Sequence, residues 1–128
     1  MSLEHQNPLV VAVLKEIEEN LKLFLTEQKE HTIFINKLPL ALPDREAIRD
    51  FLGVGSLTIE LSDSDEPAKW VESAVSGIWF GVFYSASQEP ILETIEICSF
   101  PKIAAAQTAD VEFGLAQFSR KLQEKEAL

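Results

Sequence analysis

Hydrophobic positions near the start of the chain recur every three or four residues, which is the period of an α-helix. This stripe consists of Val10, Val13, Ile17, Leu21 and Phe24. Charged residues such as Lys15 and Glu18 occupy the opposite positions. Pro8 suits the first turn of a helix, where its missing N–H is not needed. The pattern predicts a helix over about residues 8–29.

The middle of the chain changes to short apolar runs with a period near two, which is typical of β-strands. The predicted strands cover about residues 31–36, 57–61, 69–75, 78–85 and 91–98. A second helix is expected from Pro43 to Leu52, ended by Gly53. Ser76-Gly77 is expected to connect two strands as a hairpin. Residues 78–85 are apolar on both faces, which favours a central strand.

A last helix is predicted over about residues 108–125, with Thr108 or Asp110 as its N-cap. Its apolar face consists of Val111, Leu115, Phe118 and Leu122. The order of elements lacks a repeated strand–helix–strand alternation, so a parallel sheet is disfavoured. We expect one α+β domain over residues 1–128, a mostly antiparallel sheet of four to five strands with helices packed on one face.

Charge narrows the classes of partner. The 128 residues carry 11 Lys and Arg against 21 Asp and Glu, a formal net charge of -10. A surface this acidic repels phosphate, so we expect neither nucleic acid nor an anionic membrane surface as a partner. No apolar run reaches the roughly 20 residues that span a bilayer. The single Cys98 allows no internal disulfide, which fits a reducing compartment, and we expect a cytoplasmic protein.

The residues that usually carry catalysis or bind metals are scattered. His5 and His31 lie far apart, and Cys98 lies in a predicted strand, where a buried and unreactive thiol is expected. The acidic cluster at residues 63–66 lacks the glycine and the distant glutamate of a calcium-binding EF-hand loop. We therefore expect no catalytic residues, no cofactor and no metal.

One segment combines aromatic and acidic residues in a way that points to protein binding. Glu72 and Ser73 precede Gly77 and Trp79 by a few positions, and Glu96 lies in a later predicted strand. A carboxylate within an apolar strand must face solvent or a hydrogen-bond donor. If one face of the sheet is uncovered, these residues form a candidate protein-binding surface.

Several motifs together resemble a known family. These are Leu38-Pro39-Leu40, Phe51-Leu52-Gly53-x-Gly55, Glu72-Ser73-x-x-x-Gly77-x-Trp79, Ile95-Glu96-Ile97 and Pro101. Over about residues 36–104 their order and spacing resemble the conserved C-terminal region of the HupH/HyaF hydrogenase expression proteins. The chain departs from that pattern at Ser73, where threonine is typical, and at Phe80, where a basic residue is common.

The resemblance implies a non-catalytic chaperone in the maturation of uptake [NiFe] hydrogenases. Its partner would be the immature iron–sulfur small subunit or another maturation factor, and Glu72, Gly77, Trp79 and Glu96 transfer only as motif positions. Two alternatives stay open. The chain could be a homo-oligomeric interaction module that pairs through its first helix or a sheet edge. It could also be an enzyme or ligand binder that uses Cys98 or Glu72 in a pocket.

Overall fold

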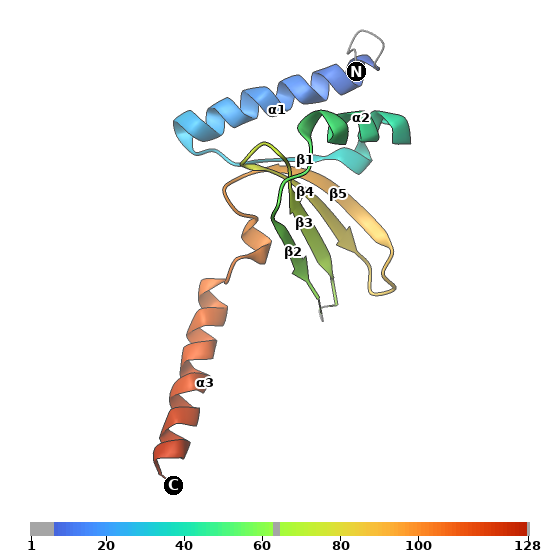
Figure 1. Cartoon of the computed structure of the whole chain (residues 1–128). Coiled ribbons are helices and arrows are strands. Elements are labelled where there is room, and N and C mark those ends of the chain that lie inside the picture. Colours follow the sequence, from blue (N-terminus) through green and yellow to red (C-terminus); the bar gives the residue numbers. More distant parts are fainter. Residues whose placement is uncertain (1–6, 63–64, 128) are drawn as a thin grey trace.

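The computed structural model describes residues 7–62 and 65–127. Three α-helices, five strands and two short 3-10 helices alternate along this part of the chain (Figure 1). The helices are α1 (Pro8–Glu27), α2 (Leu42–Leu52) and α3 (Thr108–Glu126). The strands are β1 (His31–Phe34), β2 (Thr58–Leu61), β3 (Ala68–Glu72), β4 (Ile78–Tyr84) and β5 (Pro90–Ile97). The 3-10 helices are η2 (Ile35–Lys37) and η3 (Lys102–Ala104).

The five strands form one antiparallel sheet in the order β1-β5-β4-β3-β2. This arrangement confirms the α+β class and the central position of the doubly apolar strand, β4. Successive side chains of a strand point to opposite faces of a sheet. Phe80 of β4 pairs with Ile95 of β5 and belongs with it to the core under the helices, whereas Trp79 pairs with Glu96 on the other face.

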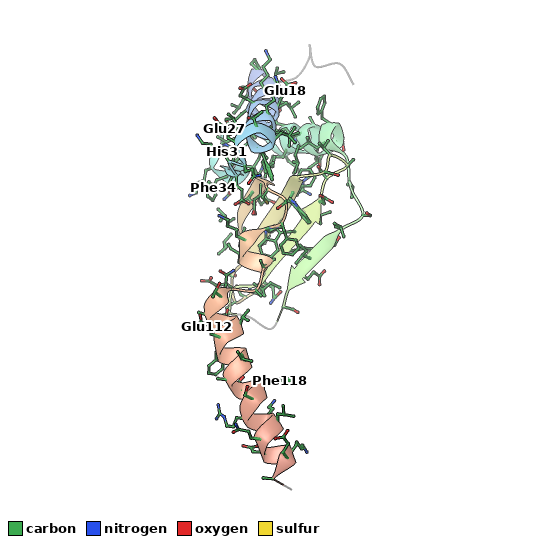
Figure 2. The ribbon with its side chains drawn as sticks, turned by 90° about the vertical axis from the view of Figure 1, so that its left-hand side faces the viewer. Glu18, Glu27, His31, Phe34, Glu112 and Phe118 are labelled. Atoms are coloured by element: carbon green, nitrogen blue, oxygen red, sulfur yellow. The ribbon has the colours of Figure 1, made fainter. Side chains whose placement is uncertain are left out.

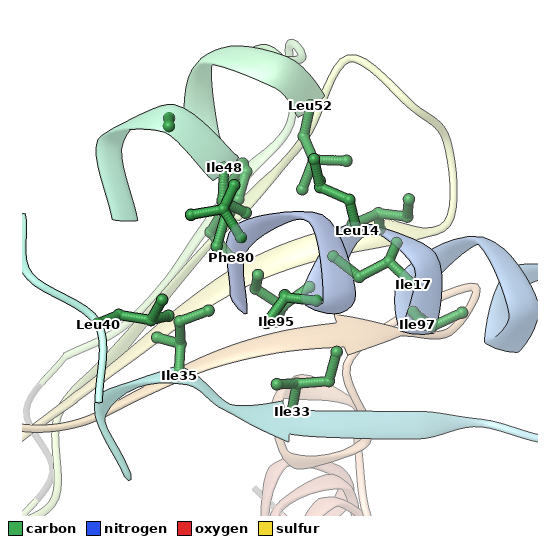
Figure 3. Close-up of a cluster of buried hydrophobic side chains, with 14 residues drawn as sticks. Leu14, Ile17, Ile33, Ile35, Leu40, Ile48, Leu52, Phe80, Ile95 and Ile97 are labelled. Carbon is green, nitrogen blue, oxygen red and sulfur yellow. The ribbon is translucent and has the colours of Figure 1, made fainter. Parts of the chain in front are cut away.

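Helices α1 and α2 cover one face of the sheet and enclose the main hydrophobic core (Figures 1 and 3). Helix α1 begins as the sequence predicted, because the side chain of Asn7 accepts a hydrogen bond from the backbone N–H of Leu9 just before Pro8. It buries Val10, Val13, Leu14 and Ile17. Complete burial of such side chains stabilises a fold by about 1.5–3 kcal/mol each, so this contact is a major part of the stability.

The second face of the sheet, here called the open face, carries no α-helix from residues 7–62 or 65–127. A smaller buried cluster lies on it, made of Ala68, Trp70, Trp79 and Cys98. The half-buried side chains of Ile59, Leu61, Phe83 and Ala104 pack around this cluster. The cluster is therefore closed partly by side chains of the sheet and partly by the segment that leads into η3.

Helix α3 forms where the sequence predicted it, but none of its residues is buried (Figure 1). Its N-cap is Gln107 rather than Thr108 or Asp110, and the cap has no side-chain hydrogen bond to the helix. The expectation that the helices pack on one face is thus met by α1 and α2, while α3 extends away from the sheet.

Candidate protein-binding site

The motif Glu72-Ser73-x-x-x-Gly77-x-Trp79 lies in the β3–β4 hairpin, at one end of the sheet. Its loop spans residues 73–77 and is held by its own side chains. The hydroxyl of Ser73 donates to the carbonyl O of Val75 (2.8 Å) and accepts from the N–H of the same residue (3.1 Å). Glu72 Oε2 accepts from the N–H of Gly77 at 3.3 Å. The φ of Gly77 is +91°, a conformation that glycine adopts without strain.

The Gly53-Val54-Gly55 motif packs directly against this hairpin. The N–H of Gly55 donates to the carbonyl O of Glu72 at 2.8 Å. A Cβ atom added to Gly55 would lie 2.9 Å from that oxygen and closer still to the carbonyl O of Ser73. Gly53 has a φ of +74°, and an added Cβ would lie 2.8 Å from the Cβ of Ala74. Gly55 is needed because the two loops touch there through their backbones, and Gly53 is needed because of its positive φ and its contact with the side chain of Ala74.

Glu72, Trp79 and Glu96 lie side by side in one cross-strand row on the open face, as the sequence indicated. The structure buries Trp79, which is only 1% exposed. Its Nε1 donates to the carbonyl O of Cys98 at 3.2 Å, and the ring of Phe100 lies edge-on at 6.1 Å. Ser73 is also buried. Trp79 and Ser73 therefore support the site from beneath, while Glu72 and Glu96 are half-buried.

A polar contact over Gly81 fixes the position of Glu96. Glu96 Oε2 accepts hydrogen bonds from Trp70 Nε1 (2.9 Å) and from the hydroxyl of Thr94 (2.7 Å). A Cβ atom at Gly81 would lie 2.7 Å from this carboxylate oxygen, so the contact requires glycine beneath it. Sequence reasoning did not assign Trp70 to this group, although its two-residue offset from Glu72 places both on one face.

Cys98 is buried, as its place in a strand suggested. Burial raises the pKa of its thiol from 9.0 to about 12, and the neighbouring carboxylates of Glu96 and Glu30 act in the same direction. The thiol is therefore protonated at neutral pH, and a protonated thiol is a poor nucleophile.

Accessible apolar side chains surround this end of the sheet. A groove of about 610 Å³ lies between the end of α1 and the segment that follows Cys98. Its apolar wall includes Phe24, Leu25 and Phe100, and Leu25 is 80% exposed. An ion pair between Lys102 Nζ and Glu30 Oε1 (3.0 Å) lies at its edge. Val75 and Val54 are also exposed in the two neighbouring loops.

No pattern in the sequence indicates this groove. Leu25 is the last apolar residue of the first helix, and Phe100 directly precedes Pro101. They are 75 positions apart in the chain, so local sequence patterns do not show that they lie close together in the fold. A groove with an apolar wall and a polar edge is typical of surfaces that bind a peptide segment.

Metal-binding chemistry has little support in the described residues. Among residues 7–62 and 65–127, no group of three or more His, Cys, Asp or Glu side chains could hold a metal ion. His31 Nε2 lies 2.8 Å from Glu16 Oε2 on the surface. His5 and Asp63, which the sequence analysis considered, lie outside the described residues. Within the described ranges, no helix is long and apolar enough to cross a membrane.

Two curated relatives are hydrogenase expression/formation proteins. The chain is 30% identical over 82 residues to HoxQ of Azotobacter vinelandii. This alignment covers 64% of this chain and 29% of that protein. The chain is also 28% identical over 101 residues to HupH of Rhizobium leguminosarum bv. viciae. This second alignment covers 79% of this chain and 36% of that protein. The chain thus spans about a third of the length of these relatives.

A solved structure matches over most of both chains. The hydrogenase expression protein HupH from Thiobacillus denitrificans superimposes with a TM-score of 0.83 at 27% identity. The match covers 90% of this chain and 95% of that one. The family model of the C-terminal conserved region of HupH hydrogenase expression proteins matches residues 10–124, a wider range than the motifs cover. The chain therefore belongs to the family of HupH hydrogenase expression proteins.

Proposed function

We propose that this chain is a cytoplasmic accessory protein in the maturation of an uptake [NiFe] hydrogenase, and that it binds the immature iron–sulfur small subunit. The observation that carries the proposal is the family match over residues 10–124. The curated relatives, much longer than this chain, are hydrogenase expression/formation proteins.

The binding surface in this proposal is the β3–β4 hairpin end together with the groove beside it. Glu72, Ser73, Gly77, Trp79 and Glu96 form its frame through the hydrogen bonds described above. Direct contact falls to exposed apolar side chains, chiefly Leu25, Phe100 and Val75. A rigid frame with apolar contacts at its surface lowers the entropy cost of binding.

Charge and thiol chemistry support a binding role without catalysis. The net charge of -10 favours a client with basic segments through complementary potential. The buried Cys98, with its pKa of about 12, lacks the thiolate character of a catalytic cysteine. In this proposal the chain shields a surface of its client until the hydrogenase subunits assemble.

A pull-down from cells that express a small-subunit precursor tests the proposal. The tagged chain is compared with Leu25→Asp, which places a charge in the groove, and with Leu42→Asp as a matched control. Leu42 is 65% exposed and lies at the start of α2. This part of α2 contacts the start of α1 through a hydrogen bond from Asn7 to Asp44. The groove lies at the opposite end of α1.

We expect the unmodified chain and the Leu42→Asp variant to recover the precursor in similar amounts. The amount of precursor recovered with Leu25→Asp should be at least tenfold lower. Equal recovery with all three chains would exclude the groove as the contact. Recovery of no precursor by the unmodified chain would exclude the proposed client.

A further inference from the structure

Helix α3 presents an apolar stripe that the rest of the chain leaves uncovered. All residues from Thr108 to Glu126 are exposed. Figure 2 shows α3, with Glu112 and Phe118 labelled, extending beyond the end of the sheet. The stripe consists of Val111, Leu115, Phe118 and Leu122, which are 56%, 64%, 66% and 50% exposed. Their spacing of four, three and four places them along one narrow side of the helix.

An isolated helix with this sequence is not expected to be stable. In proteins most of the stability of a helix comes from the packing of its apolar face rather than from intrinsic propensity. Helix α3 contains Gly114 in its interior, which costs about 1 kcal/mol relative to alanine. Its N-cap, Gln107, makes no side-chain hydrogen bond to the helix. A helix of this kind needs a surface on which to bury its stripe.

The connector before α3 directs the helix away from its own sheet. Ala104 of η3 packs against the cluster on the open face, which anchors the chain there. The side chain of Gln107 then donates to the carbonyl oxygens of Lys102 and Ala105, both at 2.8 Å. These bonds link the end of η3 to the residue before α3 and stabilise the bend of the three-residue connector.

The open face offers a surface of matching size and chemistry. Ile59, Leu61 and Phe83 lie half-buried on it around Trp70. The stripe from Val111 to Leu122 is roughly 17 Å long at 1.5 Å per residue. The four steps of β3 from Ala68 to Glu72 span roughly 14 Å at 3.4 Å per residue. A sheet buries an apolar face by packing it against another layer, and a helix can form that layer.

Charge favours a second copy of this chain as the partner of α3. The last seven residues of α3, Arg120 to Glu126, contain three of the 11 basic residues of the chain and two acidic residues, Glu124 and Glu126, a net charge of +1. The rest of the chain is strongly acidic, and the loops at the far end of the sheet carry the exposed Asp65 and Glu89. A basic helix end is attracted to such a surface and is repelled by a basic partner.

We propose that two copies of this chain exchange α3, so that each α3 docks its stripe on the open face of the other copy around Ile59, Leu61 and Phe83. The exchange is symmetric, so both uncovered surfaces of each copy are buried in a closed dimer. The proposal concerns self-association and does not depend on the hydrogenase client.

Light scattering coupled to size-exclusion chromatography measures the molar mass of the full chain in solution and so tests for the dimer. We expect a species of twice 14.3 kDa for the unmodified chain. Phe118→Lys charges the stripe and is expected to weaken dimerisation at least tenfold. Phe113→Lys is the matched control, because Phe113 is 64% exposed on the opposite side of the same helix, and it should stay dimeric. A monomeric unmodified chain, or equal effects of both variants, would overturn the proposal.

Disulfide trapping tests which surfaces meet. A chain with Leu61→Cys is mixed with a chain that carries Phe118→Cys, while Cys98 stays buried in both. We expect an intermolecular disulfide in the mixture that neither chain forms alone. A disulfide between two Phe118→Cys chains would show that the helices pair with each other instead. A disulfide within one chain that carries both changes, with no mixed product, would show that α3 folds back on its own sheet. Either result contradicts the exchange.

Discussion

Helices α1 and α3 have nearly the same length and the same kind of apolar stripe, yet they differ completely in burial. Helix α1 has 20 residues and buries four of them in the main core, whereas α3 has 19 residues and buries none. The period of the sequence therefore predicts a helix and its apolar side, but it does not predict what covers that side. Local pattern fixes the element, and contacts between distant segments fix its environment.

Truncation of one side chain in each helix gives the largest expected contrast. Ile17→Ala removes atoms from the main core, where Ile17 is 3% exposed, and should lower the free energy of unfolding by about 2–5 kcal/mol. Leu115→Ala should change it by less than about 0.5 kcal/mol at protein concentrations where the chain is monomeric. Urea unfolding followed by tryptophan fluorescence measures both. A comparable loss from Leu115→Ala in the monomer would show that α3 packs on its own chain.

Glycine substitutions give a second contrast, with opposite signs. Gly55→Ala presses a methyl group against the backbone of the β3–β4 hairpin and should destabilise the fold by about 1–3 kcal/mol. Gly114→Ala meets nothing within 4 Å and should stabilise α3 by roughly 0.5–1 kcal/mol. Thermal unfolding measures the first change, and amide hydrogen exchange in α3 measures the second. Equal protection of the α3 amides in the unmodified chain and in Gly114→Ala would argue against a marginally stable helix.

The titration and reactivity of the Cys98 thiol depend on how completely the segment after it covers the open face. Because the pKa of this thiol is about 12 in the folded chain and near 9 when unfolded, the thiol itself adds no pH dependence to the folding stability well below pH 9. As pH rises from 9 toward 12, the unfolded state loses the proton first. Stability should therefore fall by up to about 1.4 kcal/mol per pH unit.

At pH 8 a thiol reagent should modify Cys98 on the order of 100-fold more slowly in the folded chain than in guanidinium chloride. The Cys98→Ala variant provides the blank for the reagent. Rapid modification of the folded chain would mean that the segment after Cys98 opens readily and leaves the cluster around Trp79 accessible.

The sequence predicted most of the fold because its signals are local. The hairpin at Ser76-Gly77 follows from glycine's tolerance of a positive φ, and the central position of β4 follows from apolar residues on both of its faces. The burial of Trp79 could not be predicted in the same way, because the residues that cover it, Cys98 and Phe100, lie about 20 positions away. The groove joins residues still farther apart, at Leu25 and Phe100.

The contact over Gly81 has a consequence for how this sequence can change over evolutionary time. A side chain at position 81 would collide with the carboxylate of Glu96 and the hydroxyl of Thr94, which share a hydrogen bond. Loss of Glu96 alone would leave the buried indole N–H of Trp70 without its acceptor. A side chain added at position 81 or an acceptor lost at position 96 disrupts this contact, so the four residues should tend to change together rather than one at a time.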